Sequence, residues 1–144
     1  KVLDIGCGKG FLLYELSQVV PGLEVTGIDI SSYAIENAKE EIKDKLQVSN
    51  CTKLPFADNT FDFVYSINTF HNLSIEQLEQ AIQEMERVGK KSKWCCIESY
   101  RDEKEKANLL YWQLTCESFH RPESWKWLFK KNGYQGDCGF IYFG

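Results

Sequence analysis

Apolar residues in the first hundred positions form short continuous runs that alternate with runs of helical spacing. The short runs have the length and β-branched content of buried strands, whereas the others place apolar residues three and four positions apart, as one face of a helix does. The pattern predicts strands over residues 1–5, 23–30, 46–49, 61–68 and 93–100. It predicts helices over residues 11–20, 31–42 and 74–88.

Local signals mark where two of these helices begin and end. Ser31 and Ser32 offer hydroxyls that can cap the second helix. Ser74 and Gln77 have the spacing of a capping box at the start of the third, and Gly89 can serve as the residue that follows its last turn.

Strands that alternate with helices form an open parallel sheet with helices on both faces. We therefore predict an α/β, Rossmann-like, doubly wound fold. Ligands of such sheets bind beyond the carboxyl ends of the strands. The segments to inspect for chemistry are residues 6–10, 29–30, 50–52, 66–72 and 98–101.

The last third of the chain departs from this alternation. The spacing of apolar residues predicts a helix over residues 103–117 and another over 122–131, the latter beginning with Pro122. Residues 134–143 are strand-like but contain Gly136 and Gly139, which would divide them into an antiparallel pair. With 144 residues in total, we expect a single domain over 1–144.

Charge and cysteine content narrow the function. The net charge is −4, and a nucleic-acid binder normally carries a basic excess, so we expect no nucleic-acid partner. No apolar run approaches the roughly 18 residues of a membrane span. The six cysteines form no CxxC pair, so we expect no metal site and interpret them as free thiols in a reducing cytoplasm.

The chain starts inside a predicted strand and without Met, which indicates a piece of a longer protein.

The sharpest motif follows the first predicted strand, where residues 4–10 read Asp-Ile-Gly-Cys-Gly-Lys-Gly. Glycines let the backbone turn sharply and approach a ligand closely. A dinucleotide fingerprint would need a glycine where Phe11 stands, and Asp4 would repel a pyrophosphate. A ligand that carries a positive charge suits Asp4 better. The alternative is a tight turn with no ligand.

A second carboxylate, Asp29, ends the second predicted strand. A carboxylate at this point of a doubly wound sheet can accept hydrogen bonds from both hydroxyls of a ribose. The alternative is that Asp29 caps the following helix, although Ser31 and Ser32 already offer that function.

Three motifs in this order resemble the class I S-adenosylmethionine-dependent methyltransferases. They are Leu-Asp-Ile-Gly-Cys-Gly at 3–8, Gly-Ile-Asp-Ile-Ser at 27–31 and Leu-Pro-Phe-Ala-Asp-Asn-Thr-Phe-Asp at 54–62. The likeness is strongest to the small-molecule branch that includes ubiquinone and menaquinone biosynthesis methyltransferases, and it covers residues 1–100 closely. It implies a mostly parallel sheet of the seven-stranded type with its N-terminal helix missing here.

The resemblance also implies a reaction and a division of the chain. The reaction is in-line transfer of a methyl group from S-adenosyl-L-methionine to a small-molecule acceptor, leaving S-adenosyl-L-homocysteine. Residues 1–100 would form the cofactor half, and residues 101–144 the acceptor or lid half.

Individual roles follow from the resemblance. Asp4 would reach the ammonium group, Asp29 the ribose, and Ile30 the face of the adenine. Asn68 would contact the methionine end of the cofactor. The cofactor-binding residues implied in this way are Asp4, Gly6, Cys7, Gly8, Gly10, Asp29, Ile30, Asn50, Cys51, Thr52 and Asn68.

One position departs from the family pattern. Asn50 stands where family members commonly have the Asp that accepts the hydrogens of the adenine amino group. The Asn50 amide oxygen can still accept, but without a charge, so we expect weaker adenine binding. Cys51 or Thr52 would offer a backbone N–H to the ring.

His71 is the candidate catalytic base, because it follows the fourth predicted strand and a neutral-range pKa suits proton transfer. The alternative is a histidine that only hydrogen-bonds locally. Further candidates for the acceptor side are His120, Tyr100, Arg101, Tyr111 and Trp112. We expect one of Trp125 and Trp127 to be buried and the other exposed, because they lie on opposite sides of one helical turn.

Two other functions remain open at this point. One is a catalytically inactive module that binds S-adenosylmethionine, and the other is methylation of RNA or protein. The fourth predicted strand is followed by neither Asn/Asp-Pro-Pro-Tyr/Phe nor Pro-Cys, which disfavours nucleic-acid bases as acceptors.

Overall fold

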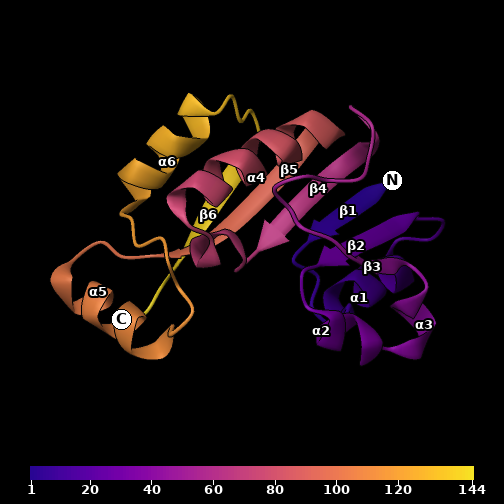
Figure 1. Cartoon of the computed structure of the whole chain (residues 1–144), viewed down its shortest axis with the longest axis horizontal. Coiled ribbons are helices and arrows are strands. Elements are labelled where there is room, and N and C mark those ends of the chain that lie inside the picture. Colours follow the sequence, from indigo (N-terminus) through magenta and orange to yellow (C-terminus); the bar gives the residue numbers. More distant parts are fainter.

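Six strands form one parallel sheet in the computed structural model, which describes residues 1–144 (Figure 1). The strand order is β3-β2-β1-β4-β5-β6. The strands are β1 (Val2–Ile5), β2 (Val25–Asp29), β3 (Leu46–Val48), β4 (Phe61–Ile67), β5 (Gly89–Ser99) and β6 (Asp137–Tyr142). The helices are α1 (Phe11–Val19), α2 (Ser32–Glu36), α3 (Glu40–Lys43), the 3₁₀ turn η1 (Phe70–Asn72), α4 (Ile75–Val88), α5 (Glu103–Trp112) and α6 (Pro122–Lys131). The predicted doubly wound fold is confirmed.

Strand β1 lies in the middle of the sheet because the chain leaves it in two directions. Leu3 is in register with Thr26 of β2 on one side and with Val64 of β4 on the other. The chain first builds outward through β2 and β3 and then returns to the opposite edge of β1. This reversal leaves a crevice at the carboxyl ends of β1 and β4, where doubly wound folds bind their ligands.

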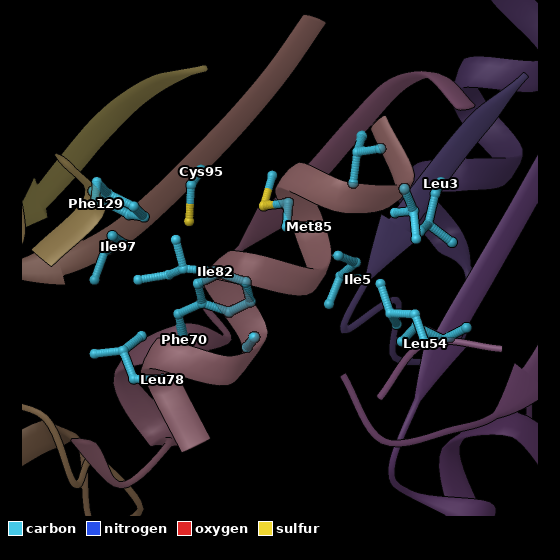
Figure 2. Packing of buried hydrophobic residues seen from close by; sticks show 14 of the residues in the cluster. Leu3, Ile5, Leu54, Phe70, Leu78, Ile82, Met85, Cys95, Ile97 and Phe129 are labelled. Atoms are coloured by element: carbon cyan, nitrogen blue, oxygen red, sulfur yellow. The ribbon is translucent and has the colours of Figure 1, made fainter. Parts of the chain in front are cut away.

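Alternation along the strands divides the core into two layers. Leu3 and Ile5 of β1 point to the face covered by α4 and α6, where the larger cluster of buried side chains lies (Figure 2). Val2 points to the opposite face, where Leu13 of α1 and Ile42 of α3 form a smaller cluster. Asp4 shares the face of Val2, because successive side chains of a strand point to opposite sides.

Helix α4 carries the capping box that the sequence predicts. The Ser74 hydroxyl accepts the Gln77 backbone N–H, and the Gln77 side chain accepts the Ser74 N–H. Its buried face consists of Leu78, Ala81, Ile82, Met85 and Val88. The prediction for Gly89 is wrong: its φ is −94°, it is extended, and it already begins β5. A side chain there would meet Lys93 Cε at 2.7 Å.

The helix predicted over residues 31–42 is interrupted. Ser31 caps α2 by accepting the Ala34 N–H, as expected. Asn37 then ends the helix, because both its backbone and its side-chain N–H groups donate to the Tyr33 carbonyl. The chain next bonds to the glycine turn through Lys39 N–H and Lys9 O before α3 begins.

In the last third of the chain, one predicted helix is confirmed and the other predicted elements differ from the structure. Helix α6 has the predicted bounds, and Trp125 is fully buried while Trp127 is 61% exposed. Helix α5 ends at Trp112, several residues early. The predicted antiparallel pair is wrong, because β6 is one strand that runs parallel to β5. Gly139 does not break it: the missing side chain leaves room for the Trp94 ring, which would lie 2.7 Å from a Cβ.

The remaining global features concern membranes, thiols and metals. None of the helices has both the length and the apolar character needed to cross a bilayer. All six cysteines are free thiols. No three His, Cys, Asp or Glu side chains gather in a group that could hold a metal ion.

Candidate cofactor-binding site

A cleft of about 460 Å³ opens at the carboxyl ends of β1, β2, β3 and β4. Small-molecule sites typically have volumes of about 300–1,000 Å³. The residues that line the cleft are Ile5, Gly6, Ile28, Asp29, Ile30, Ser49, Asn50, Cys51, Ile67, Asn68, Thr69, Asn72, Leu73 and Gln77. Of the predicted site residues, the cleft therefore brings together Gly6, Asp29, Ile30, Asn50, Cys51 and Asn68. It does not include Asp4, Cys7, Gly8, Gly10, Thr52 or His71.

The glycine turn after β1 is held against β2. The N–H groups of Gly6 and Cys7 both donate to the Ile28 carbonyl. Gly6 has a φ of +83°, and a Cβ on it would lie 2.0 Å from Thr69 Oγ1, so no other residue fits. Gly8 has a φ of +57°, and a Cβ there would meet nothing within 4 Å. The outer face of the turn is thus open to a ligand.

Gly10 serves packing and does not reach the cleft. It precedes α1, and a Cβ on it would lie 2.8 Å from Ile42 Cγ2. Gly10 therefore has a packing function, because it lets α1 start close to α3, and its predicted cofactor role stays a prediction.

The Asp29 carboxylate is aimed by two backbone donors. Its Oδ2 accepts the Gly8 N–H at 2.8 Å, and its Oδ1 accepts the Ser31 N–H at 2.9 Å. Ser31, and not Asp29, caps α2 through its side chain. A carboxylate offers about four lone-pair sites, so each oxygen keeps one that can accept a ligand hydroxyl. This geometry suits a ribose, whose two neighbouring hydroxyls can each donate to one oxygen.

Asp4 is buried beneath the turn, with 4% of its surface exposed, on the face that α1 covers. Burial raises the pKa of Asp4 to about 7; the hydroxyl of Tyr65 opposes this rise and the charge of Asp29 adds to it. Asp4 and Tyr65 are neighbours in register on β1 and β4. No cation of the protein neutralises this carboxylate, so a ligand cation placed at the turn would stabilise its ionised form.

Cys7 lies inside the turn beside Asp4. A Cβ on Gly27 would lie 2.9 Å from the Cys7 sulfur, so Gly27 provides the room for this side chain. Burial raises the pKa of the Cys7 thiol to about 12, and the nearby charges of Asp4 and Asp29 add to the effect. The thiol is therefore protonated and unreactive at neutral pH.

The end of β3 contributes a short polar turn. The amide oxygen of Asn50 accepts two hydrogen bonds from Thr52, one from the backbone N–H at 3.0 Å and one from the hydroxyl at 2.8 Å. Two of the expected adenine contacts are thus already used within the protein: the Asn50 oxygen and the Thr52 N–H. The Cys51 N–H donates to no protein group and remains available.

Asn68 turns the chain from β4 into η1. Its φ is +56°, a left-handed conformation that asparagine tolerates better than most residues. Its N–H donates to the Cys96 carbonyl at 2.9 Å, which fixes this conformation against β5. The turn places Asn68 and Thr69 in the wall of the cleft opposite Asn50.

His71 does not lie on an open rim. It is 1% exposed, and its Nε2 lies 3.1 Å from Glu98 Oε2 without the alignment of a hydrogen bond. Burial lowers the pKa of His71 to about 4 and raises the pKa of Glu98. Glu98 lies in the predicted segment 98–101, but no role was predicted for it, although an acid at the carboxyl end of an apolar strand is a signal of such a site.

The segment 113–118 covers this pair. The N–H groups of Glu117 and Ser118 both donate to the His71 carbonyl, and the Gln113 amide donates to Glu98 Oε1 at 3.0 Å. His71 is therefore buried in this structure and does not line the cleft. The reason given for a catalytic base, a pKa in the neutral range, does not hold for a ring whose pKa burial lowers to about 4, and the role of His71 as a base stays a prediction.

The other acceptor candidates are spread over the surface and the core. His120 lies edge-on against Trp125, with its buried Nε2 unpartnered, and it does not line the cleft. Tyr111 and Trp112 are exposed at the end of α5. These side chains form no common pocket in this conformation.

Comparison with known proteins gives a consistent result. A family model described as "Methyltransferase domain" matches residues 3–97, more than half of the chain. A demethylmenaquinone methyltransferase of Thermotoga maritima is 36% identical over 92 residues, which are 63% of this chain and 39% of that protein. A sterol 24-C-methyltransferase of Gibberella zeae is 38% identical over 97 residues, which are 62% of this chain and 25% of that protein.

The solved structures agree in fold. The YcgJ protein of Bacillus subtilis superimposes with a TM-score of 0.75 at 24% identity, covering 91% of this chain and 60% of that one. At this identity the likeness concerns the fold alone. The chain spans well under half the length of the two curated relatives named above.

Proposed function

This chain belongs to the methyltransferase-domain family, and on that premise we propose that it transfers a methyl group from S-adenosyl-L-methionine to a small-molecule acceptor. The observation that carries the proposal is Asp29, which two backbone N–H groups hold at the carboxyl end of β2, beside the glycine turn, with one accepting site left on each oxygen. That arrangement fits the two hydroxyls of a nucleoside ribose.

The protein residues fit the ribose and the amino-acid end of this cofactor. When bound, S-adenosyl-L-methionine supplies a methyl carbon activated by a sulfonium leaving group, and S-adenosyl-L-homocysteine remains. Asp29 would hold the ribose, while the open face at Gly8 admits the chain that leads to the amino acid. Asp4 lies beneath the turn as the counter-charge for an ammonium group. Ile30, 69% exposed, and the Cys51 N–H would contact the base.

On the acceptor side, the residues position a substrate and exclude water. Orientation alone can supply about 7–11 kcal/mol of a reaction barrier. The segment 113–118 closes the region above η1, and beneath it the neutral imidazole of His71 would accept the proton of an acceptor that carries one. A small-molecule acceptor is supported by the net charge of −4 and by relatives named for demethylmenaquinone and for sterols.

Methyl transfer from a tritiated donor tests this proposal. The protein is incubated with S-[methyl-³H]adenosylmethionine and a cell extract, which is then separated by ultrafiltration and solvent extraction. We expect label in the small-molecule fraction, and none with an Asp29→Ala control. Label in the RNA or protein fraction would show that the acceptor is a macromolecule and not a small molecule. If the protein binds the cofactor but transfers label to no fraction, it is a binding module without methyltransferase activity.

A further inference from the structure

The side chain of Asn50 has its orientation fixed by Thr52. Its amide oxygen has two lone pairs, and Thr52 fills both, through the backbone N–H at 3.0 Å and the hydroxyl at 2.8 Å. If the amide were rotated by half a turn, its NH₂ group would face the Thr52 N–H, donor against donor. The amide nitrogen therefore points away from Thr52 and offers two N–H donors.

Asn50 lies where the base of a bound nucleoside belongs. The cleft runs from the glycine turn past Asp29 to the end of β3, and Asn50 and Cys51 form that end of it. If Asp29 holds the ribose and the charged amino-acid part lies at the turn above Asp4, the base points toward Asn50. This step rests on the proposed function.

We propose that the site reads the C6 substituent of the purine with a hydrogen-bond donor, so that a 6-oxopurine nucleoside binds at least as well as the adenine nucleoside. The C6 amino group of adenine carries only donors and would oppose the Asn50 NH₂ group. An oxygen at C6 is an acceptor and would receive an N–H from Asn50. An acidic residue at the same position would have the opposite preference, because a carboxylate only accepts.

Titration calorimetry with two thioethers, S-adenosylhomocysteine and S-inosylhomocysteine, measures this preference directly. For the unmodified chain we expect the inosyl compound to bind within about threefold of the adenosyl compound, or more tightly. Asn50→Asp restores an outward acceptor and is expected to favour the adenosyl compound by about tenfold or more. Thr52→Val frees one lone pair of Asn50 and is expected to shift the ratio in the same direction by a smaller factor.

Thr26→Val is the matched control, because Thr26 lies on β2 outside the cleft and its hydroxyl makes no hydrogen bond to the protein. It should leave the ratio unchanged. Preference of the unmodified chain for the adenosyl compound by about tenfold or more would overturn the inference, whatever the ratio in Asn50→Asp, and would leave the proposed function standing. Failure of both compounds to bind would overturn the proposed function, and the inference with it.

Discussion

Replacing Asp4 by Asn is expected to stabilise the ligand-free protein at alkaline pH and to weaken cofactor binding. Asp4 is 4% exposed, and burial raises its pKa to about 7 from the ordinary value of 3.8. Between those two pH values the unfolded chain releases the proton while the folded chain keeps it. The folded state therefore loses stability as the pH rises through this window.

The size of the effect follows from the shift. Each pKa unit corresponds to about 1.4 kcal/mol, so a rise of about three units gives an upper limit of about 4 kcal/mol above pH 7. Asparagine has the shape of the protonated acid and cannot ionise. The difference in unfolding free energy between Asp4→Asn and the parent should therefore grow by about 2–4 kcal/mol from pH 4 to pH 8.

Urea unfolding of both proteins at several pH values provides the test. The other titrating groups are common to both proteins and cancel in the difference. A difference that stays constant from pH 4 to pH 8 would refute the reasoning, because it would mean that Asp4 ionises as readily in the folded chain as in the unfolded one. Calorimetry at pH 8 should also show weaker binding of S-adenosylhomocysteine to the variant, because the ammonium group of the ligand then lacks the Asp4 carboxylate as its counter-charge.

Three further predictions concern the turn, the buried histidine and the helix cap. Gly6→Ala places a methyl group 2.0 Å from Thr69 Oγ1, whereas the Cβ of Gly8→Ala meets nothing within 4 Å. Gly6→Ala should therefore reduce the unfolding free energy by about 2 kcal/mol more than Gly8→Ala does. Equal losses in urea unfolding would contradict this. The His71 ring should titrate near pH 4 in NMR spectra, because burial lowers its pKa. The contribution of the neutral ring to stability is then present above pH 6.5 and is lost as the pH falls toward 4. A titration midpoint near 6.5 would show that the ring is not buried. Ser74→Ala removes the capping box and should cost about 1 kcal/mol, and no loss would show that the cap contributes nothing.

The sequence predicts best those features that depend on neighbouring residues. The capping box at Ser74, the bounds of α6 and the order of strands and helices all arise from local spacing. The Asn50–Thr52 turn is equally local, since asparagine often accepts from the backbone two residues on, and it could have been read from the sequence.

The features that the sequence does not predict depend on distant parts of the chain. The break after α2 is tied to Lys9, which bonds to Lys39 across thirty positions. Strand β6 pairs with β5 across about forty positions, and Gly139 leaves room there for the ring of Trp94. The burial of His71 depends on the segment 113–118, whose contacts with η1 have no periodic signature.

The affinity of S-adenosylhomocysteine for the chain and for its Asp29→Ala variant, measured by titration calorimetry, tests the cofactor site most directly. Glu24→Ala is the control, because Glu24 is an exposed carboxylate just before the opposite end of β2, outside the cleft. We expect the parent and Glu24→Ala to bind alike and Asp29→Ala to bind at least about tenfold more weakly, a loss of about 1.4 kcal/mol. Equal affinities for all three proteins would contradict the assignment of the ribose to Asp29.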